Sequence, residues 1–130
     1  VVNAVGKDAR LLIEVAPILE RILGSSLVPL TMNGAEARTR LRMTLRKFFR
    51  AICSRDFPLV LVMDDLQWAD SGSLDLLYAM ASDDKNQGLV LVFTCRSNEV
   101  TSSSGFAIML RQLEDEKRAS IRNILVDNLS

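Results

Sequence analysis

Two short runs of apolar residues that do not alternate with polar ones are the clearest pattern along the chain. They occupy residues 59–63 and 89–94, and each has the length of a strand. A continuous apolar run is typical of a central strand of a parallel sheet, because such a strand is buried on both faces. We therefore expect both faces of these strands to be covered. One helix between them would make a right-handed βαβ unit.

The first part of the chain predicts short helices. Asp8 can cap a helix that starts at residue 9, and Gly24 ends the apolar pattern. Pro17 interrupts that pattern, which predicts a kink or two short helices with Pro17 in the first turn of the second. The apolar positions that keep the helical period are Leu11, Leu12, Val15, Ile18, Leu19 and Ile22. Residues 25–34 are expected to form a loop.

Residues 35–54 predict a longer amphipathic helix. Its apolar stripe consists of Ala37, Leu41, Leu45, Phe48 and Ile52, and its other face carries Arg38, Arg40, Arg42, Arg46, Lys47 and Arg50. A cationic helix admits nucleic-acid binding. A solvated helix face is the favoured interpretation, because basic and acidic residues balance at 16 each and no DNA-reading motif accompanies the helix. A docking surface for a neighbouring domain is the third interpretation.

The second half predicts further elements around the two apolar runs. Asp70 or Ser71 can cap a helix that runs to about residue 81, with Leu74, Leu77 and Tyr78 facing inward. The remaining expected elements are a polar turn, a flexible Ser-rich loop, a helix and a third strand, at residues 82–88, 101–105, 106–118 and 121–126.

Composition limits the class of protein. A chain of 130 residues with 48% hydrophobic residues fits one globular domain. The absence of histidine excludes the usual zinc sites and any His-based catalytic triad. Cys53 and Cys95 follow no metal or redox spacing, so we expect buried, reduced thiols in an intracellular, cytoplasmic protein. No apolar stretch has the length of a membrane span.

Two adjacent acids, Asp64 and Asp65, follow the first apolar run directly. Open α/β sheets place their ligand crevice at this carboxyl end of the strands. Paired carboxylates repel each other unless a cation or hydrogen-bond donors stabilise them. Mg²⁺, with phosphate oxygens completing its shell, is a suitable cation. This is the form of a Walker B segment, in which the first acid holds the metal and the second orients or deprotonates a water. The alternative is that Asp65 only begins a turn.

The longer string DDLQWAD at residues 64–70, followed by Ser71 and an amphipathic helix, resembles the Walker B region of the signal-transduction ATPases with numerous domains. These are AAA-type P-loop ATPases of LuxR-type regulators, some adenylate cyclases, and large serine/threonine and hybrid histidine kinases. The resemblance covers residues 5–130, is sharpest over 58–70, and gains weight from residues 96–100. It implies a partial P-loop NTPase fold of the α/β class. In that fold three α/β/α layers contain a mainly parallel sheet made of the Walker B strand, the sensor 1 strand and the following strand, with helices on both faces.

The resemblance also implies roles for three residues and a pair of cofactors. Asp64 would hold Mg²⁺, Asp65 would orient the attacking water, and Arg96, at the sensor 1 position, would reach the γ-phosphate of ATP. Arg96 could instead be solvated or paired with Glu99 or one of the two acids. The implied function is an ATP-binding and ATP-hydrolysing regulatory switch within a larger kinase or transcriptional regulator, whose partners are other domains of the same chain. Neither nucleic acid nor a membrane is expected as a partner.

The phosphate-binding loop of these ATPases is the part that this sequence lacks. None of the six glycines begins the pattern G-x-x-x-x-G-K-[ST], and Gly6 with Lys7 does not form it. In the resembling family that loop lies upstream and a helical lid lies downstream. We therefore expect an incomplete domain, with a helical segment over residues 1–57 and the Walker B to post-sensor 1 region over 58–130. Alone, it should be marginally stable and bind ATP weakly or not at all.

Two other functions are alternatives to the ATPase interpretation. A non-catalytic interaction module with a degenerate NTPase fold would account for the missing loop. A phosphoacceptor receiver domain would also suit an acidic pair at a strand end. It ranks last, because it needs another Asp and a Lys at later strand ends, and the second apolar run ends in Thr94, Cys95 and Arg96 instead.

Overall fold

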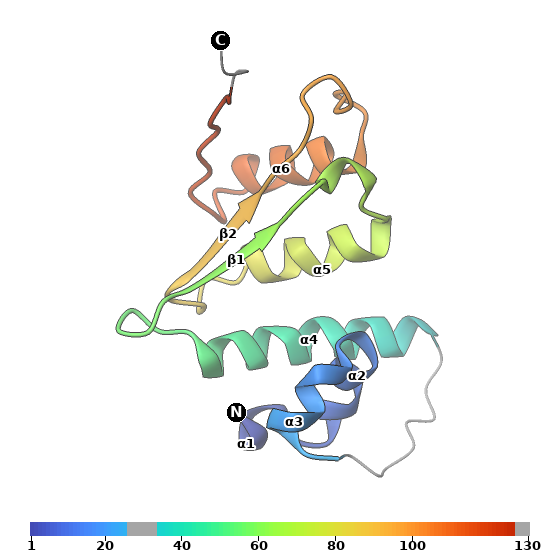
Figure 1. Ribbon diagram of the computed structural model, residues 1–130, viewed down its shortest axis with the longest axis vertical. Helices are drawn as coiled ribbons and strands as arrows, with labels where there is room; N and C mark the ends of the chain where they lie inside the picture. Colours follow the sequence, from blue (N-terminus) through green and yellow to red (C-terminus); the bar gives the residue numbers. More distant parts are fainter. Residues whose placement is uncertain (26–33, 127–130) are drawn as a thin grey trace.

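The computed structural model describes residues 1–25 and 34–126, as short N-terminal helices, one long helix and a βαβ unit followed by a further helix. In chain order the elements are α1 (Val2–Val5), η1 (Gly6–Asp8), α2 (Ala9–Val15), η2 (Pro17–Leu19), α3 (Glu20–Leu23), α4 (Gly34–Ile52), β1 (Leu59–Met63), η3 (Leu66–Trp68), α5 (Ser71–Ala81), β2 (Leu89–Phe93) and α6 (Gly105–Asp115) (Figure 1). Most of the expected loop over residues 25–34 lies outside the described residues.

The two apolar runs pair as a parallel sheet, as predicted. Leu59 lies opposite Leu89 and Met63 lies opposite Phe93, with α5 as the connection. Asp70 caps α5 by accepting a hydrogen bond from the Ser73 backbone N–H at 2.9 Å. The chain is thus of the α/β class, with one βαβ unit at its centre, and this much is compatible with part of a P-loop NTPase fold.

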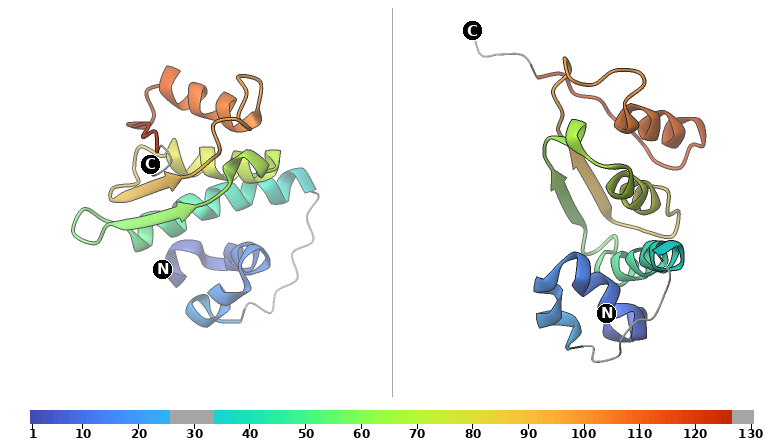
Figure 2. Two further views of the ribbon diagram at one scale, coloured as in Figure 1. Left: turned by 45° about the horizontal axis from the view of Figure 1, so that its top comes forward. Right: turned by 90° about the vertical axis from the view of Figure 1, so that its right-hand side faces the viewer.

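The expectation that both faces of the strands are covered is wrong for the described structure. The helices α5 and α6 lie on one side of the sheet (Figure 2). The valines on the other side are exposed, at 56% for Val60, 62% for Val62, 49% for Val90 and 39% for Val92. The leucines of both strands point toward the helices and pack against the core. Apolar runs predict strands well, but they do not show which face has a neighbour.

The expected third strand over residues 121–126 does not form. The segment has no regular structure and runs away from the sheet (Figure 2). Ile124, Leu125 and Val126 are 85%, 78% and 85% exposed. A strand needs a neighbour to satisfy its backbone N–H and C=O groups, and in the described structure this segment pairs with neither β1 nor β2.

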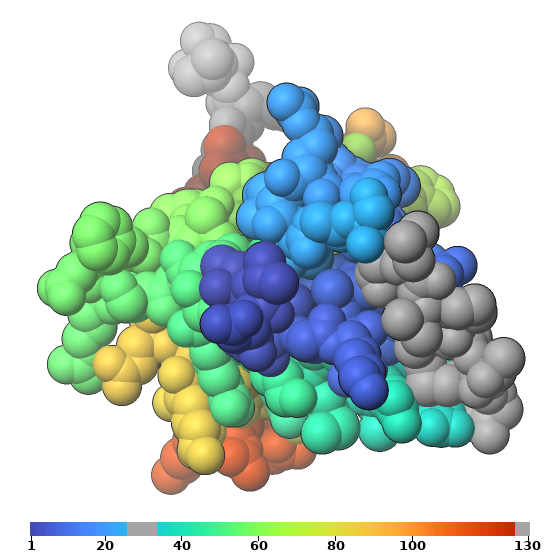
Figure 3. Space-filling view, turned by 90° about the horizontal axis from the view of Figure 1, so that it is seen from below, coloured from blue at the N-terminus to red at the C-terminus, as the bar shows by residue number. Residues whose placement is uncertain are grey.

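The N-terminal helices follow the proline and glycine signals. α2 ends before Pro17, which begins η2, and Gly24, with φ 79°, ends α3. The predicted side-chain cap by Asp8 is wrong, since Asp8 belongs to η1 and is in helical conformation. Its carboxylate instead lies 3.5 Å from Arg40 Nη1, which ties this layer to α4. Seen from below, the N-terminal helices lie across α4 (Figure 3).

The long helix α4 lies between the N-terminal layer and α5 (Figure 1). Its buried residues are Thr44, Phe48 and Phe49, while the predicted Ala37, Leu41, Leu45 and Ile52 are half-buried. The opposite, cationic face is not simply solvated as expected. Arg46 donates from Nε to the Ala79 carbonyl oxygen at 2.8 Å, and Arg50 forms an ion pair with Asp83.

Two smaller expectations also need correction. Cys53 is buried, and burial raises the pKa of its thiol, but Cys95 is exposed; both are free thiols. The last helix, α6, ends at Asp115 rather than at Arg118, because Lys117 adopts a positive φ of 52°. Within residues 1–25 and 34–126, none of the helices combines the length and the apolar character needed to cross a bilayer.

Candidate functional site

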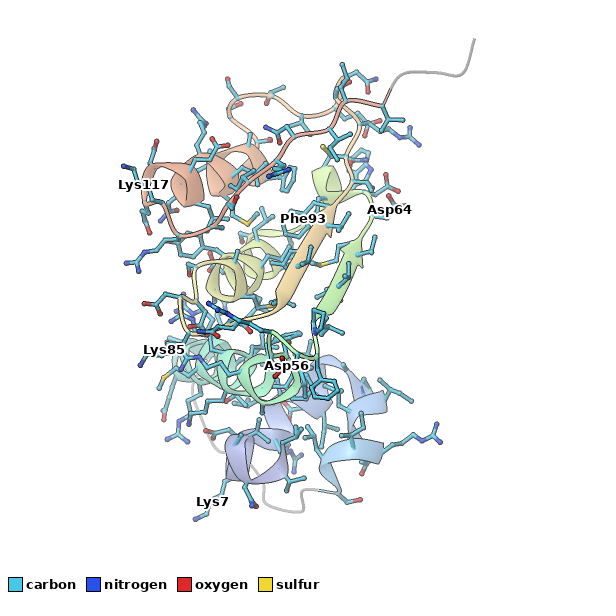
Figure 4. The ribbon with its side chains drawn as sticks, turned by 90° about the vertical axis from the view of Figure 1, so that its left-hand side faces the viewer. Lys7, Asp56, Asp64, Lys85, Phe93 and Lys117 are labelled. Carbon is cyan, nitrogen blue, oxygen red and sulfur yellow. The ribbon has the colours of Figure 1, made fainter. Side chains whose placement is uncertain are left out.

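The ends of β1 and β2 meet at one edge of the sheet, because the strands are parallel. Asp64 and Asp65 follow β1 there, and Thr94 follows β2. Figure 4 shows Asp64 near Phe93, at the end of the strands opposite to Asp56. All three of these polar residues are exposed. The predicted acid pair therefore lies where an open parallel sheet binds its ligands.

Asp64 is held by a partner that sequence reasoning missed. The Thr94 hydroxyl donates a hydrogen bond to Asp64 Oδ1. The register explains this contact, since Met63 lies opposite Phe93 and the next residues along both strands are Asp64 and Thr94. Within the described chain Asp64 Oδ2 accepts no hydrogen bond, so this oxygen remains available to a ligand. A hydroxyl at the end of the second apolar run was the signal that could have identified Thr94.

Asp65 has an unusual backbone conformation. It is one of two non-glycine residues with positive φ in the described chain, at φ 58° and ψ 42°. Such left-handed conformations cost about 1 kcal/mol or more, and Asp tolerates them better than most residues. The Asp65 backbone N–H lies 3.3 Å from Thr94 Oγ1, so Thr94 contacts both acids. Asp65 does begin a turn, as the alternative interpretation required, but its carboxylate stays exposed and available.

The turn after Asp65 is fixed at both ends. Leu66 is 5% exposed, and its backbone N–H donates to the Thr94 carbonyl oxygen at 3.0 Å. Asp70 accepts hydrogen bonds from the Ser73 backbone N–H and from the Ser73 hydroxyl, which lower the pKa of Asp70 below its ordinary value. The acid pair is thus carried by a short turn anchored in the core and at the start of α5.

Gln67 connects this turn to the loop after β2, and sequence reasoning gave it no role. Its Nε2 donates to Asp65 Oδ1 at 2.9 Å, and its Oε1 accepts from the Arg96 backbone N–H at 3.4 Å. Within the described residues Asp65 Oδ2 accepts no hydrogen bond. Each acid of the pair therefore has one oxygen engaged and one left over. An amide two residues after the acids was the available sequence signal.

Arg96 lies in the same loop cluster but does not reach the acids. Its side chain is 69% exposed, and Nη1 lies 3.4 Å from Glu99 Oε1. Of the alternatives drawn from the sequence, solvation and pairing with Glu99 both describe the observed state. The structure thus brings Asp64 and Asp65 together with Thr94 and Gln67. It places the Arg96 backbone at the site, with the guanidinium group turned toward Glu99.

The oxygen donors at this edge suit a hard cation. The described residues contain no group of three or more His, Cys, Asp or Glu side chains able to hold a metal ion by themselves. Mg²⁺ does not need such a group, because it is usually held by one or two carboxylates, with water and phosphate oxygens completing its shell. The free oxygen of Asp64 and its neutral hydroxyl partner fit that pattern. The residues needed to bind the phosphates themselves are not evident, since the sequence lacks the glycine-rich loop pattern.

A separate polar cavity of about 230 Å³ lies on the helical side of the molecule. It is lined by Arg46, Arg50, Tyr78, Ser82, Asp83, Asp84, Glu116 and Arg118. The charged groups in its lining already interact with one another: Arg50 binds Asp83 and is also attracted by Asp84, and Glu116 accepts a hydrogen bond of 2.5 Å from Tyr78. The side chains that line this cavity connect the helices to one another, and neither Asp64 nor Asp65 is among them.

Comparison with known proteins gives one match. A family model described as an AAA ATPase domain matches residues 4–93. The matched range includes Asp64, Asp65 and Gln67, and ends with β2, just before Thr94 and Arg96. No curated protein and no solved structure matches the chain.

Proposed function

The chain belongs to the AAA ATPase domain family. We propose that the carboxyl end of its two strands, with Asp64, Asp65 and Thr94, is the part of an ATP-hydrolysing site that binds the metal and the attacking water; we call this group the acid edge. The observation that carries the proposal is the meeting of Asp64 and Asp65 with Thr94 at the carboxyl end of two parallel strands. Each acid keeps one oxygen without a hydrogen bond from the described residues, which is the arrangement that a metal and a water require.

The proposal gives a separate role to each of four side chains. Asp64 holds Mg²⁺ through its free oxygen, while Thr94 fixes the other oxygen. Mg²⁺ neutralises charge on the phosphate oxygens of ATP when it is bound. Asp65 accepts a hydrogen bond from the attacking water and orients it, which makes this edge the Walker B segment of the domain. Arg96 turns from Glu99 to contact the γ-phosphate. This costs little free energy, because the side chain is exposed and is held by a single ion pair of 3.4 Å.

The proposed setting is a regulatory switch in a larger signalling protein of the kinase or transcriptional-regulator type. The resemblance of residues 64–70 to the signal-transduction ATPases supports it. Residues 1–130 would be an incomplete ATPase domain, with the phosphate loop and lid elsewhere in that protein. Other domains of the same chain would be its partners. Since the described residues leave the valine side of the sheet exposed, a third layer would come from helices outside them. The use of ATP and the two free thiols favour an intracellular, cytoplasmic location.

Substitution of Asp65 tests the proposal most directly. In the protein that carries this chain, Asp65→Asn should reduce ATP turnover at least about a hundredfold and leave nucleotide affinity within about threefold, because only the water loses its acceptor. Asp64→Asn should raise the Mg²⁺ concentration needed for activity. The matched control is Asp56→Asn, an exposed acid before the other end of β1, which should change neither. Unchanged hydrolysis by Asp65→Asn would sink the assignment.

The open valine face supports a second candidate function, a non-catalytic interaction module. Val60, Val62, Val90 and Val92 form a contiguous apolar surface on paired strands. A protein that had lost its phosphate loop could still use such a surface for binding another protein or domain. This function predicts that the protein carrying the chain never binds nucleotide. Equilibrium dialysis with Mg-ATP separates the two candidates, since measurable binding excludes the second.

A further inference from the structure

One side chain, Gln67, joins the two loops of the candidate site. It donates from Nε2 to Asp65 Oδ1 at 2.9 Å and accepts at Oε1 from the Arg96 backbone N–H at 3.4 Å. Asp65 follows β1 and Arg96 follows β2, so the amide bridges both strand ends. The roles proposed above for the acids and the arginine do not use this residue.

The chemistry of the two contacts requires a primary amide at this position. Asp65 offers a carboxylate, which only accepts, and the Arg96 backbone offers an N–H, which only donates. Gln67 can form both hydrogen bonds because it carries a donor and an acceptor on one rigid planar group. Glutamate would lose the donor and place a second negative charge beside Asp65. Methionine, which is similar in length, would lose both contacts.

The backbone around Gln67 is fixed, so its side chain has a defined direction. Gln67 is the central residue of η3, and the flanking Leu66 is 5% exposed. The Trp68 backbone N–H donates to the Asp65 carbonyl oxygen at 3.1 Å, which closes the turn. Gln67 itself is half-buried. A short, anchored turn of this kind holds a side chain more firmly than a free loop does.

We propose that Gln67 is a positioning residue that fixes the Asp65 carboxylate and ties it to the loop carrying Arg96. This proposal rests on the function proposed above. Because Gln67 occupies Oδ1, the Oδ2 atom of Asp65 is the oxygen left to face a water. Because the same amide holds the Arg96 N–H, a displacement of that loop moves Gln67 and, through it, Asp65. The γ-phosphate contact and the orientation of the water are thereby coupled.

The first test measures this coupling without nucleotide. In the isotope-labelled protein that carries the chain, NMR follows the Asp65 side-chain carboxyl carbon and the Arg96 backbone amide. Gln67→Met should shift both signals. Gln67→Glu should shift the Asp65 signal and leave the Arg96 amide near its place, since glutamate keeps the acceptor oxygen. The matched control is Gln112→Met, because Gln112 makes the same kind of contact with Glu116, at 3.1 Å on α6, and should move neither signal.

The second test is kinetic and uses the full protein that carries the chain. Gln67→Met should lower kcat about tenfold to a hundredfold and leave KM for Mg-ATP within about twofold, because the orientation of the water is lost and nucleotide binding is not. Gln112→Met should leave both constants unchanged. A merely structural role for Gln67 would lower the fraction of folded protein without this separation of kcat from KM.

The outcomes distinguish failure of this proposal from failure of the proposed function. If Gln67→Met leaves the Asp65 and Arg96 signals in place in a folded chain, Gln67 does not position Asp65, whatever the protein does with ATP. If the signals move but kcat stays at the wild-type value, the contact exists without serving the reaction, and the proposal fails. If the wild-type protein hydrolyses no ATP, the proposed function fails, and this proposal fails with it because it rests on that function. The NMR signals then still show whether Gln67 holds Asp65 in place.

Discussion

The ion pair between Arg50 and Asp83 should be a main contribution to the stability of the helical layer. Arg50 lies in the last turn of α4 and donates from Nε to Asp83 Oδ2 at 2.7 Å and from Nη2 to Oδ1. The Asp83 side chain is 2% exposed, whereas that of Arg50 is 36% exposed. The pair is therefore asymmetric, since only the carboxylate depends fully on its partner for solvation.

This asymmetry sets the expected magnitudes. Removing one partner of a buried pair costs about 3–5 kcal/mol. Arg50→Ala should fall at the lower end, about 3 kcal/mol, because Asp83 keeps the Lys85 backbone N–H at 3.2 Å and water can enter where the arginine was. Asp83→Asn should cost only about 1–2 kcal/mol, because the remaining arginine can reach solvent and the neutral amide leaves no buried charge. The double variant should cost less than the sum of the single variants by at least about 1 kcal/mol.

Urea unfolding, followed by circular dichroism, measures these differences. The matched control is Arg38→Ala, an exposed arginine on the same helix, which should change the free energy of unfolding by less than about 0.5 kcal/mol. In thermal melts the Arg50→Ala loss corresponds to about 10 °C in Tm for a chain of this size. The reasoning is refuted if Arg50→Ala costs less than about 1 kcal/mol, or if Asp83→Asn costs as much as Arg50→Ala.

Three further predictions concern pH, a glycine and the isolated chain. Burial alone would raise the pKa of Asp83, but hydrogen bonds from Arg50 and the Lys85 N–H, together with the charges of Arg50 and Arg46, outweigh it and lower the pKa. The resulting stability is therefore present above the unfolded pKa of about 3.9 and is lost as pH falls through the folded-state pKa. Acid titration of stability should show a smaller loss in Asp83→Asn than in wild type, with the remainder due to other carboxylates of lowered pKa such as Asp70 and Glu116. Gly88→Ala should cost about 2–4 kcal/mol in urea unfolding, because φ is +95° there and a Cβ would overlap the Ser54 carbonyl group. The control is Gly34→Ala, which has open space around it and should be neutral or stabilising. Equal effects of the two substitutions on the free energy of unfolding would contradict the argument. The isolated chain should bind Mg-ATP weakly or not at all, since its sequence lacks the phosphate loop. Micromolar Mg-ATP binding by the chain would contradict this.

Local signals in the sequence predicted the elements that depend on neighbouring residues. Asp70 at the start of α5 and Gly24 after α3 act within one turn of their own position, and the structure has both helix ends as expected. The strand over residues 121–126 failed because a strand depends on a second segment, which its own apolar residues do not specify.

Contacts between distant residues were the part that the sequence did not predict. Arg50 and Asp83 are separated by 33 residues, and nothing local distinguishes Arg50 from Arg38 on the same helix. Only the packing of α4 against α5 decides which arginine meets a buried acid. For the same reason Thr94 and Gln67 were missed as partners of the acids, although both residues were visible in the sequence.

The acid edge ultimately depends on how the two apolar runs alternate. In both strands leucine points toward the helices and valine points away, so the sequences LVLVM and LVLVF present the longer side chains to the core. A slip of one residue in the pairing would turn one strand over and bring its valines against the helices in place of its leucines. The same slip would remove Thr94 from Asp64, because their contact follows directly from the pairing of Met63 with Phe93. The packing of leucines on one face of the sheet therefore sets the position of the polar groups at its edge.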